Sequence, residues 1–255
     1  MILTDLHTHT TFCDGENTPE EMAEAAIEKG MQTLGFSMHS YTSFDLSCCP
    51  SEKAVDDYRR EIDRIKEKYK DKIQILCGIE QDFYSDSAAE GFDYVIGSVH
   101  YVKCKDGYYA VDDTQQIFQE AAEKCFNSDY YSLCERYFET VSQVTEKTGA
   151  DIIGHFDLVC KFNKDGRFFD ESHPRYIAAY TKAVKALVKA GKPFEINTGA
   201  LSRGYGKIYP SPAILKCIYE NGGTVILSSD SHKKETLCFK FEKTAQIARQ
   251  IGFKL

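Results

Sequence analysis

The sequence predicts an α/β fold in which parallel βα units close into a barrel, and three observations support this prediction. Seven short β-rich runs recur along the 255 residues. Each run is followed by a polar cluster and then by a segment with helical spacing, as in a parallel sheet with helical crossovers. No linker rich in Pro, Gly or Ser interrupts the pattern, so we expect residues 1–255 to form a single domain around one core. The seven runs are Met1–Leu6, Thr33–Ser37, Lys72–Ile79, Tyr94–Val99, Asp151–Gly154, Pro193–Asn197 and Thr224–Ser228.

Helix signals lie between these runs. The segment Thr18–Glu21 has the spacing of a capping box, with proline at the first helical position, and the helix that it opens ends at Gly30. Ser51 can cap a second helix that continues to about Lys70. Further helices are expected over 129–148, where Leu133, Tyr137, Val141 and Val144 recur at helical spacing, from Pro174, from Pro212 to before Gly222, and over 239–251.

The residues that follow each strand carry the functional information in a barrel of this kind, because its sites lie at the C-terminal ends of the strands. The least regular segments of the chain are Tyr41–Pro50 and Lys103–Asp113. We interpret both as loops near the site.

Composition and charge exclude several partners. The formal net charge is −8, and no run of Lys and Arg stands apart from acidic neighbours, so nucleic acid is not an expected partner. No apolar stretch approaches the ~20 residues that a membrane span needs. The first residues contain an early acidic group, Asp5, and neither a basic nor a long apolar region, so we expect no secretory signal.

The ten cysteines are scattered and contain no C-x-x-C pair. A chain of this length is stable without disulfide staples. We therefore expect reduced thiols and a cytoplasmic protein.

Six of the seven histidines follow predicted strands: His7, His9, His39, His100, His155 and His232. The H-x-H pair places two imidazoles on one face of a strand, because side chains alternate along it. A single histidine in such a position is more often structural than a metal ligand. The gathering of six at one rim of the barrel instead favours a metal site.

Three carboxylates, Asp14, Glu80 and Asp230, occur among these histidines. Asp14 taken alone also fits a turn before Gly15. Glu80 ends a mostly apolar strand, where an unpaired carboxylate would cost on the order of 3–5 kcal/mol. With four to six ligands per metal, nine such side chains imply two to three divalent cations, and this mixture of imidazole and carboxylate suits Zn, Mn or Fe.

Five strings of the sequence together resemble the polymerase-and-histidinol-phosphatase (PHP) superfamily, and within it the histidinol-phosphatase branch. They are Asp-Leu-His-Thr-His, Gly-Ile-Glu, Ile-Gly-Ser-Val-His, Ile-Ile-Gly-His-Phe-Asp-Leu and Ser-Ser-Asp-Ser-His. The resemblance covers nearly the whole chain and implies a distorted (β/α)7 TIM-like barrel that holds a trinuclear metal centre. Two positions depart from the family pattern: Met38 replaces a common Asp, and Gly199-Ala200 replaces Ser-Gly. Neither departure removes a proposed ligand.

The resemblance also implies how the nine side chains divide among three metals. The first metal takes His7, His9, Glu80 and Asp230; the second shares Glu80 and adds His100 and His155; the third takes Asp14, His39 and His232. Glu80 is thus expected to bridge two cations.

The expected reaction is hydrolysis of L-histidinol phosphate, a small phosphomonoester, by a hydroxide that bridges the two metals of Glu80. Lys161 and Arg203, after the fifth and sixth strands, are the candidate partners of the phosphoryl oxygens, although ordinary solvated charge also explains each. Asp230 is a candidate for handling the proton of the leaving alcohol. The candidate catalytic residues are therefore Glu80, Asp230 and Arg203.

Three alternatives stay open from the sequence. A PHP phosphodiesterase or nucleotide phosphatase would use the same metal centre, but no inserted domain is evident and the charge is acidic. A non-catalytic, metal-bound accessory module would often lose ligands, whereas all nine are present. An amidohydrolase would be expected to place a metal-bridging Lys at the strand end where this chain has Glu80. The sequence predicts neither the oligomeric state nor the residues that hold the substrate's amine and imidazole.

Overall fold

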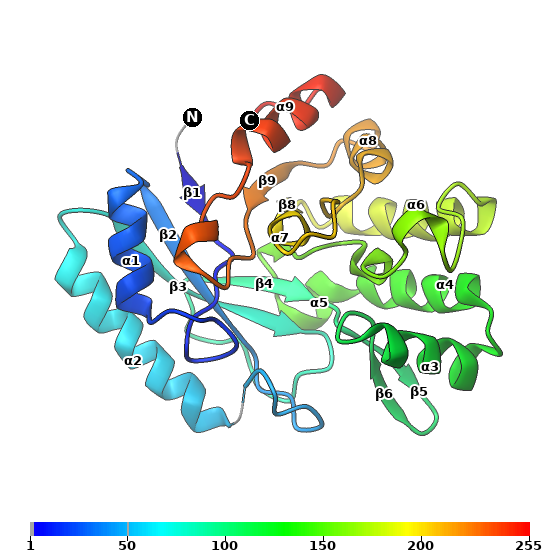
Figure 1. The fold of residues 1–255 in the computed structure, drawn as a ribbon, viewed down its shortest axis with the longest axis horizontal. Helices are drawn as coiled ribbons and strands as arrows, with labels where there is room; N and C mark the ends of the chain where they lie inside the picture. The colour runs from blue at the N-terminus through cyan, green and yellow to red at the C-terminus, as the bar shows by residue number, and fades with distance from the viewer. Residues whose placement is uncertain (1–2, 50) are drawn as a thin grey trace.

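The computed structural model describes residues 3–49 and 51–255, so the first two residues of the predicted first strand and Pro50 lie outside the described part. Seven strands form one parallel sheet in the order β1-β2-β3-β4-β7-β8-β9. Neighbouring strands of this sheet follow one another along the chain, and every connection except the one between β3 and β4 contains helices (Figure 1). The strands are β1 (Thr4–Asp5), β2 (Thr33–His39), β3 (Gln74–Asp82), β4 (Tyr94–Ser98), β7 (Ile152–Ile153), β8 (Phe194–Asn197) and β9 (Val225–Ser228).

The sheet nearly closes on itself between its first and last strands. Just beyond β1 and β9, Thr8 forms a parallel bridge with Ser231. The His9 amide donates to the Ser231 carbonyl at 2.8 Å, and the Ser231 amide donates to the His7 carbonyl at 3.1 Å. The predicted barrel is therefore confirmed, and its closing contact lies among the predicted metal ligands.

The helices surround this barrel, with α1 and α2 on one side and α3, α4 and α6 on the other (Figure 1). The predicted capping box is present: Thr18 Oγ1 accepts from the Glu21 amide at 3.2 Å, and Glu21 Oε2 accepts from the Thr18 amide at 2.8 Å. The helices are α1 (Pro19–Glu28), α2 (Glu52–Tyr69), α3 (Gln115–Phe126), α4 (Tyr130–Val141), α5 (Val144–Thr148), α6 (Pro174–Val188), α7 (Gly199–Ser202), α8 (Pro212–Glu220) and α9 (Phe241–Ile251), with short 3₁₀ turns at Leu158–Cys160, Lys164–Gly166 and Lys234–Thr236. No helix among the described residues is long and apolar enough to cross a membrane.

Tyr94 on β4 fills the barrel interior. Its hydroxyl lies 2.9 Å from the Phe36 carbonyl and also contacts the Leu6 carbonyl. A Cβ added to Gly35 on β2 or to Gly78 on β3 would lie within 2.5 Å of this side chain, so both strands need glycine there. The ring thus packs across β1, β2 and β3 beneath the strand ends.

Two expectations about the elements need correction, and one helix was not expected. The segment 103–113 is not simply a loop, because β5 (Tyr101–Cys104) and β6 (Gly107–Ala110) form an antiparallel hairpin. Helix α3 was not anticipated. The helix expected over 129–148 is interrupted at Ser142–Gln143 and becomes α4 and α5.

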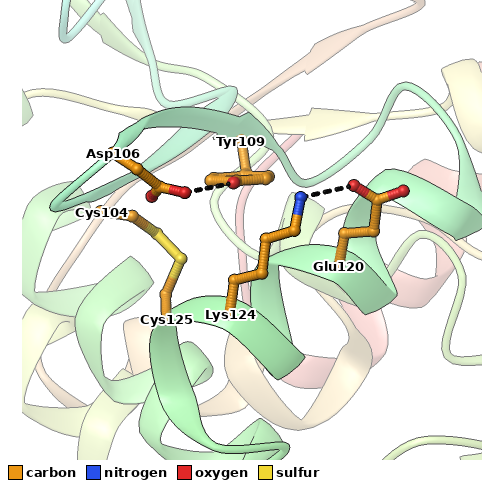
Figure 2. Close-up of a disulfide and its surroundings, with 6 residues drawn as sticks. All are labelled: Cys104, Asp106, Tyr109, Glu120, Lys124 and Cys125. Carbon is orange, nitrogen blue, oxygen red and sulfur yellow. Dashed lines mark hydrogen bonds and ion pairs between the residues drawn. A yellow bond between two sulfur atoms is a disulfide. The ribbon is translucent and has the colours of Figure 1, made fainter.

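The expectation that all cysteines are reduced is wrong for one pair. Cys104 at the end of β5 forms a disulfide with Cys125 in α3, and Figure 2 shows Lys124 and Tyr109 beside it. The two Cα atoms are 5.7 Å apart, within the range that a disulfide spans. Packing of the hairpin on α3 creates this proximity, and the spacing of the cysteines in the sequence does not reveal it. The other eight cysteines are free.

Candidate metal centre

All nine predicted ligands meet at the C-terminal end of the barrel. Each comes from the end of a strand or from the loop that follows it, as the βα pattern requires. Each of the nine lies within 4.0 Å of a carboxylate or imidazole of another member of the set. The nine residues are His7, His9 and Asp14 after β1, His39 on β2, Glu80 on β3, His100 after β4, His155 after β7, and Asp230 and His232 after β9.

Glu80 lies at the centre of this cluster and is almost completely buried. Five imidazoles face its carboxylate: Oε1 lies 2.8 Å from His155 Nε2 and 3.3 Å from His100 Nε2, while Oε2 lies 3.0 Å from His39 Nδ1, 3.2 Å from His7 Nε2 and 3.5 Å from His9 Nε2. Burial opposes ionisation of Glu80, but these imidazoles outweigh it and hold its pKa well below the ordinary value. The carboxylate is therefore charged; Oε1 also accepts from Ser98 Oγ at 2.7 Å, whereas Oε2 has no hydrogen-bond partner among the described residues.

The ligand atoms form three compact groups, and the atoms within each group lie within 4.8 Å of one another. The groups are His9, Asp14, His39 and His232; His7, His9 and Asp230; and His39, Glu80 and His100. The first two resemble the expected third and first metal sets. The last group takes His39 in place of the expected His155, although His155 also contacts Glu80.

Unpartnered buried atoms show that these residues fit metal ions. His7 Nε2, His9 Nε2 and Glu80 Oε2 are buried without a hydrogen-bond partner among the described residues. Leaving such a group unsatisfied costs about 1–3 kcal/mol. Lone pairs that converge in this way, from imidazoles and a carboxylate, are the donor set that divalent transition metals prefer.

The protonation of the histidines points the same way. Burial disfavours a charged imidazole at His39 and His100, but Glu80 and neighbouring aspartates outweigh burial and raise the pKa of both. Burial and the nearby His232 and His39 instead lower the pKa of His9. The cluster thus needs positive charge to balance its carboxylates, and protons supply that charge where cations do not.

The prediction missed Glu195, which holds one of the proposed ligands in place. Glu195 lies on β8 and is fully buried, and its Oε2 accepts from His7 Nδ1 at 2.8 Å and from Ser228 Oγ at 2.6 Å. With the His7 proton on Nδ1, the Nε2 lone pair faces Glu80. The sequence did contain a signal for Glu195, because an unpaired carboxylate buried in the apolar run Pro193–Asn197 would carry the same free-energy cost that identified Glu80.

Asp82 at the end of β3 has the same relation to His100. Its Oδ2 accepts from the His100 amide at 2.9 Å and lies 3.1 Å from His100 Nδ1. This contact directs Nε2 of the imidazole toward Glu80. Asp82 lies two residues beyond Glu80, the predicted ligand on the same strand, so the strand-end pattern does not identify it.

Arg203 and Lys161 both line the cavity of about 330 Å³ above the cluster. Arg203 Nη2 lies 2.9 Å from Asp230 Oδ2, and Asp230 raises the pKa of the guanidinium. Lys161 Nζ lies 3.6 Å from Asp112 Oδ2 and also donates to the Asp112 carbonyl. The structure therefore brings both predicted basic side chains, Arg203 and Lys161, to the site, and each has a carboxylate partner.

The two departures from the family pattern have different consequences. Met38 is buried in the core beside α1 and α2 and does not line the cavity. Gly199 begins α7, and a Cβ added there would lie 2.7 Å from Arg203 Nη2 and 2.9 Å from Asp230 Oδ2. A glycine at this position therefore makes room for the Arg203 guanidinium.

The fold and site define a barrel hydrolase of the PHP type, and comparison with known proteins agrees. The family model described as PHP domain matches residues 5–199, so the chain belongs to this family. Among curated relatives, a probable histidinol-phosphatase of Schizosaccharomyces pombe is 28% identical over 247 residues, covering 89% of this chain and 79% of the relative. The histidinol-phosphatase of Bacillus subtilis is 25% identical over 262 residues, covering 93% and 96%.

Solved structures share the fold. A putative histidinol phosphatase of Listeria monocytogenes has a TM-score of 0.80 at 20% identity, covering 94% of this chain and 99% of that one. The histidinol phosphate phosphatase of Lactococcus lactis, complexed with zinc, L-histidinol and phosphate, has a TM-score of 0.73 at 23% identity, covering 99% and 94%. The predicted family and the distorted seven-stranded barrel are confirmed.

Proposed function

We propose that this chain is a histidinol-phosphatase, which hydrolyses L-histidinol phosphate to L-histidinol and phosphate as one metallohydrolase domain. The observation that carries the proposal is the convergence of nine ligand-type side chains, with unpartnered donor atoms, beneath one cavity. The names of the curated relatives support the choice of substrate, as does the Lactococcus lactis complex with zinc, L-histidinol and phosphate.

Two to three divalent Zn, Mn or Fe ions would be held by the nine side chains, with Glu80 shared between two of them. When bound, such ions supply a water nucleophile that ionises near neutral pH, and positive charge for the phosphoryl oxygens. Glu195 and Asp82 would keep His7 and His100 in the orientation that this binding requires.

Arg203 is the residue best placed to bind the phosphoryl oxygens of the substrate. Its contact with Asp230 fixes the guanidinium at the edge of the metal cluster, and its side chain remains 35% exposed toward the cavity. A planar guanidinium can pair with two phosphoryl oxygens as charge develops on them. Lys161 lies on the same cavity and would add a second positive charge.

Asp230 is assigned here as a metal ligand and as the anchor of Arg203. Its Oδ2 accepts from Arg203 at 2.9 Å and from Asn197 Nδ2 at 3.2 Å, while Oδ1 lies 3.5 Å from His9 Nε2. Oδ2 is thus engaged by two donors, whereas Oδ1 faces the imidazoles of the cluster. Transfer of a proton to the leaving alcohol through Oδ2 would need one of its two contacts to open.

The test is phosphate release from three substrates by protein with measured metal content. L-Histidinol phosphate should be hydrolysed with a kcat/KM at least tenfold above that of nucleoside monophosphates. Bis-p-nitrophenyl phosphate should be a poorer substrate still. A preference for the diester or for nucleotides at full metal content would replace this proposal with the phosphodiesterase or nucleotide-phosphatase alternative.

A further inference from the structure

Asp45 is a pocket carboxylate without a cationic partner. It lies in the loop after β2 and lines the same cavity as Arg203 and Lys161. Two other carboxylates of this cavity have partners, since Asp82 pairs with His100 and Asp112 with Lys161. Asp45 has no ion pair within the described ranges 3–49 and 51–255. Its charge is therefore available to a ligand in the cavity.

The Asp45 carboxylate is held in a fixed position. Its Oδ2 accepts from the Tyr101 hydroxyl at 2.8 Å, and its Oδ1 accepts from the Ser47 amide at 3.0 Å and from Ser47 Oγ at 2.6 Å. Burial opposes ionisation, but these hydrogen bonds outweigh it and lower the pKa of Asp45. The group is charged at neutral pH, and because it is already ordered, pairing with a ligand costs it little conformational entropy.

Aromatic contacts fix the loop that carries Asp45. The neighbouring Phe44 ring stacks on Tyr108 of β6 with centroids 3.9 Å apart, and it meets Tyr101 of β5 edge-on at 5.0 Å. The loop and the β5–β6 hairpin therefore form one wall of the cavity. This wall contributes a negative charge and an aromatic surface, whereas Arg203 and Lys161 contribute positive charges elsewhere in the same cavity.

A ligand that fits this distribution carries an anionic group and a cationic nitrogen in one small molecule. We propose that Asp45 is a specificity residue that pairs with the nitrogen-bearing end of the phosphomonoester, while the phosphoryl group lies at the metal cluster and Arg203. This inference rests on the proposed function and deepens it. Asp113 also lines the cavity, but its side chain is exposed, so solvent screens its charge.

The experiment compares a substrate that has the nitrogen groups with one that lacks them. In Asp45→Asn, which keeps the shape and removes the charge, the ratio of kcat/KM for L-histidinol phosphate to kcat/KM for p-nitrophenyl phosphate should fall at least about tenfold, mostly through KM. The inhibition constant of L-histidinol should rise by a similar factor relative to that of inorganic phosphate. Asp45→Ala, checked by its melting temperature, gives the same comparison in a second variant.

Asp86→Asn is the matched control. Asp86 Oδ2 accepts from the Ser43 amide at 2.8 Å and so supports the same loop, but Asp86 does not line the cavity. Its loss should leave the substrate ratio within about twofold. Equal losses on both substrates in Asp45→Asn would make Asp45 a structural residue, and no loss would show that it does not bind the substrate. Either result would overturn this inference but not the proposed function. A wild-type enzyme that does not prefer L-histidinol phosphate would overturn the proposed function, and the assignment of Asp45 with it.

Discussion

At the scale of single residues, Glu80 is the side chain on which the geometry of the site depends. Its two oxygens separate the surrounding imidazoles into one group that includes His155 and another that includes His7. A carboxylate arranged in this way can bridge two cations and offset their mutual repulsion. The sequence identified Glu80 because burial of an unpaired charge is costly, and the same rule applied to Glu195 would have identified that residue as well.

Glu80→Gln tests the bridging role, because it keeps the shape while it removes one charge and one good donor oxygen. We expect kcat to fall by at least ~10³, since a nucleophile generated by two metals supplies several kcal/mol. Glu90→Gln, at an exposed position, is the control and should retain wild-type turnover. If Glu80→Gln keeps a tenth of wild-type turnover at full metal occupancy, Glu80 does not bridge.

Arg203→Ala tests phosphate recognition separately from metal binding. We expect kcat/KM for phosphomonoesters to fall by roughly 10²–10³, because one charged contact to developing charge is lost, with metal content unchanged. Arg203→Lys should restore part of the loss, since an ammonium provides a point charge in place of a planar fork. Steady-state kinetics at two ionic strengths make the measurement. An effect within threefold at both would identify Arg203 as solvated surface charge.

At the scale of elements, the sequence predicted the barrel strands better than the additions to the barrel. The break between α4 and α5 was missed because Val141 and Val144 remain three residues apart and both are buried, so the apolar spacing continues across it. The β5–β6 hairpin did have a partial signal, the Asp106-Gly107 pair, although the two turn residues are Lys105 and Asp106 and Gly107 begins β6. Its proximity to α3 had none, because that contact depends on tertiary packing.

The disulfide between Cys104 and Cys125 should stabilise this addition. It closes a loop with a sequence separation of 21, for which the entropy of the unfolded chain predicts about 3 kcal/mol. Cys104→Ser should therefore lower the free energy of unfolding by about that amount in urea denaturation without reductant, whereas Cys217→Ser, which changes a free cysteine, should not. Equal stability of wild-type protein with and without a dithiol reductant would show that this bridge contributes nothing.

At the scale of the whole molecule, closure of the barrel makes one rim from segments far apart in the chain. The contact between Thr8 and Ser231 brings the H-x-H pair beside Asp230 and His232 across more than 200 residues. The sequence could predict this ring of ligands, since a position at a strand end translates directly into a place on the rim. It could not predict Asp45, whose place in the cavity wall depends on how a loop packs against the hairpin.

The metal content of the purified protein tests the central claim most directly. Protein prepared without chelator should contain at least two equivalents of Zn, Mn or Fe per chain by elemental analysis, because nine converging ligands exceed what one ion can bind. Removal of these ions should abolish phosphate release from L-histidinol phosphate, and addition of Mn²⁺ or Zn²⁺ should restore it. Less than one equivalent per chain, with no activity after Mn²⁺ or Zn²⁺ is added, would contradict the account.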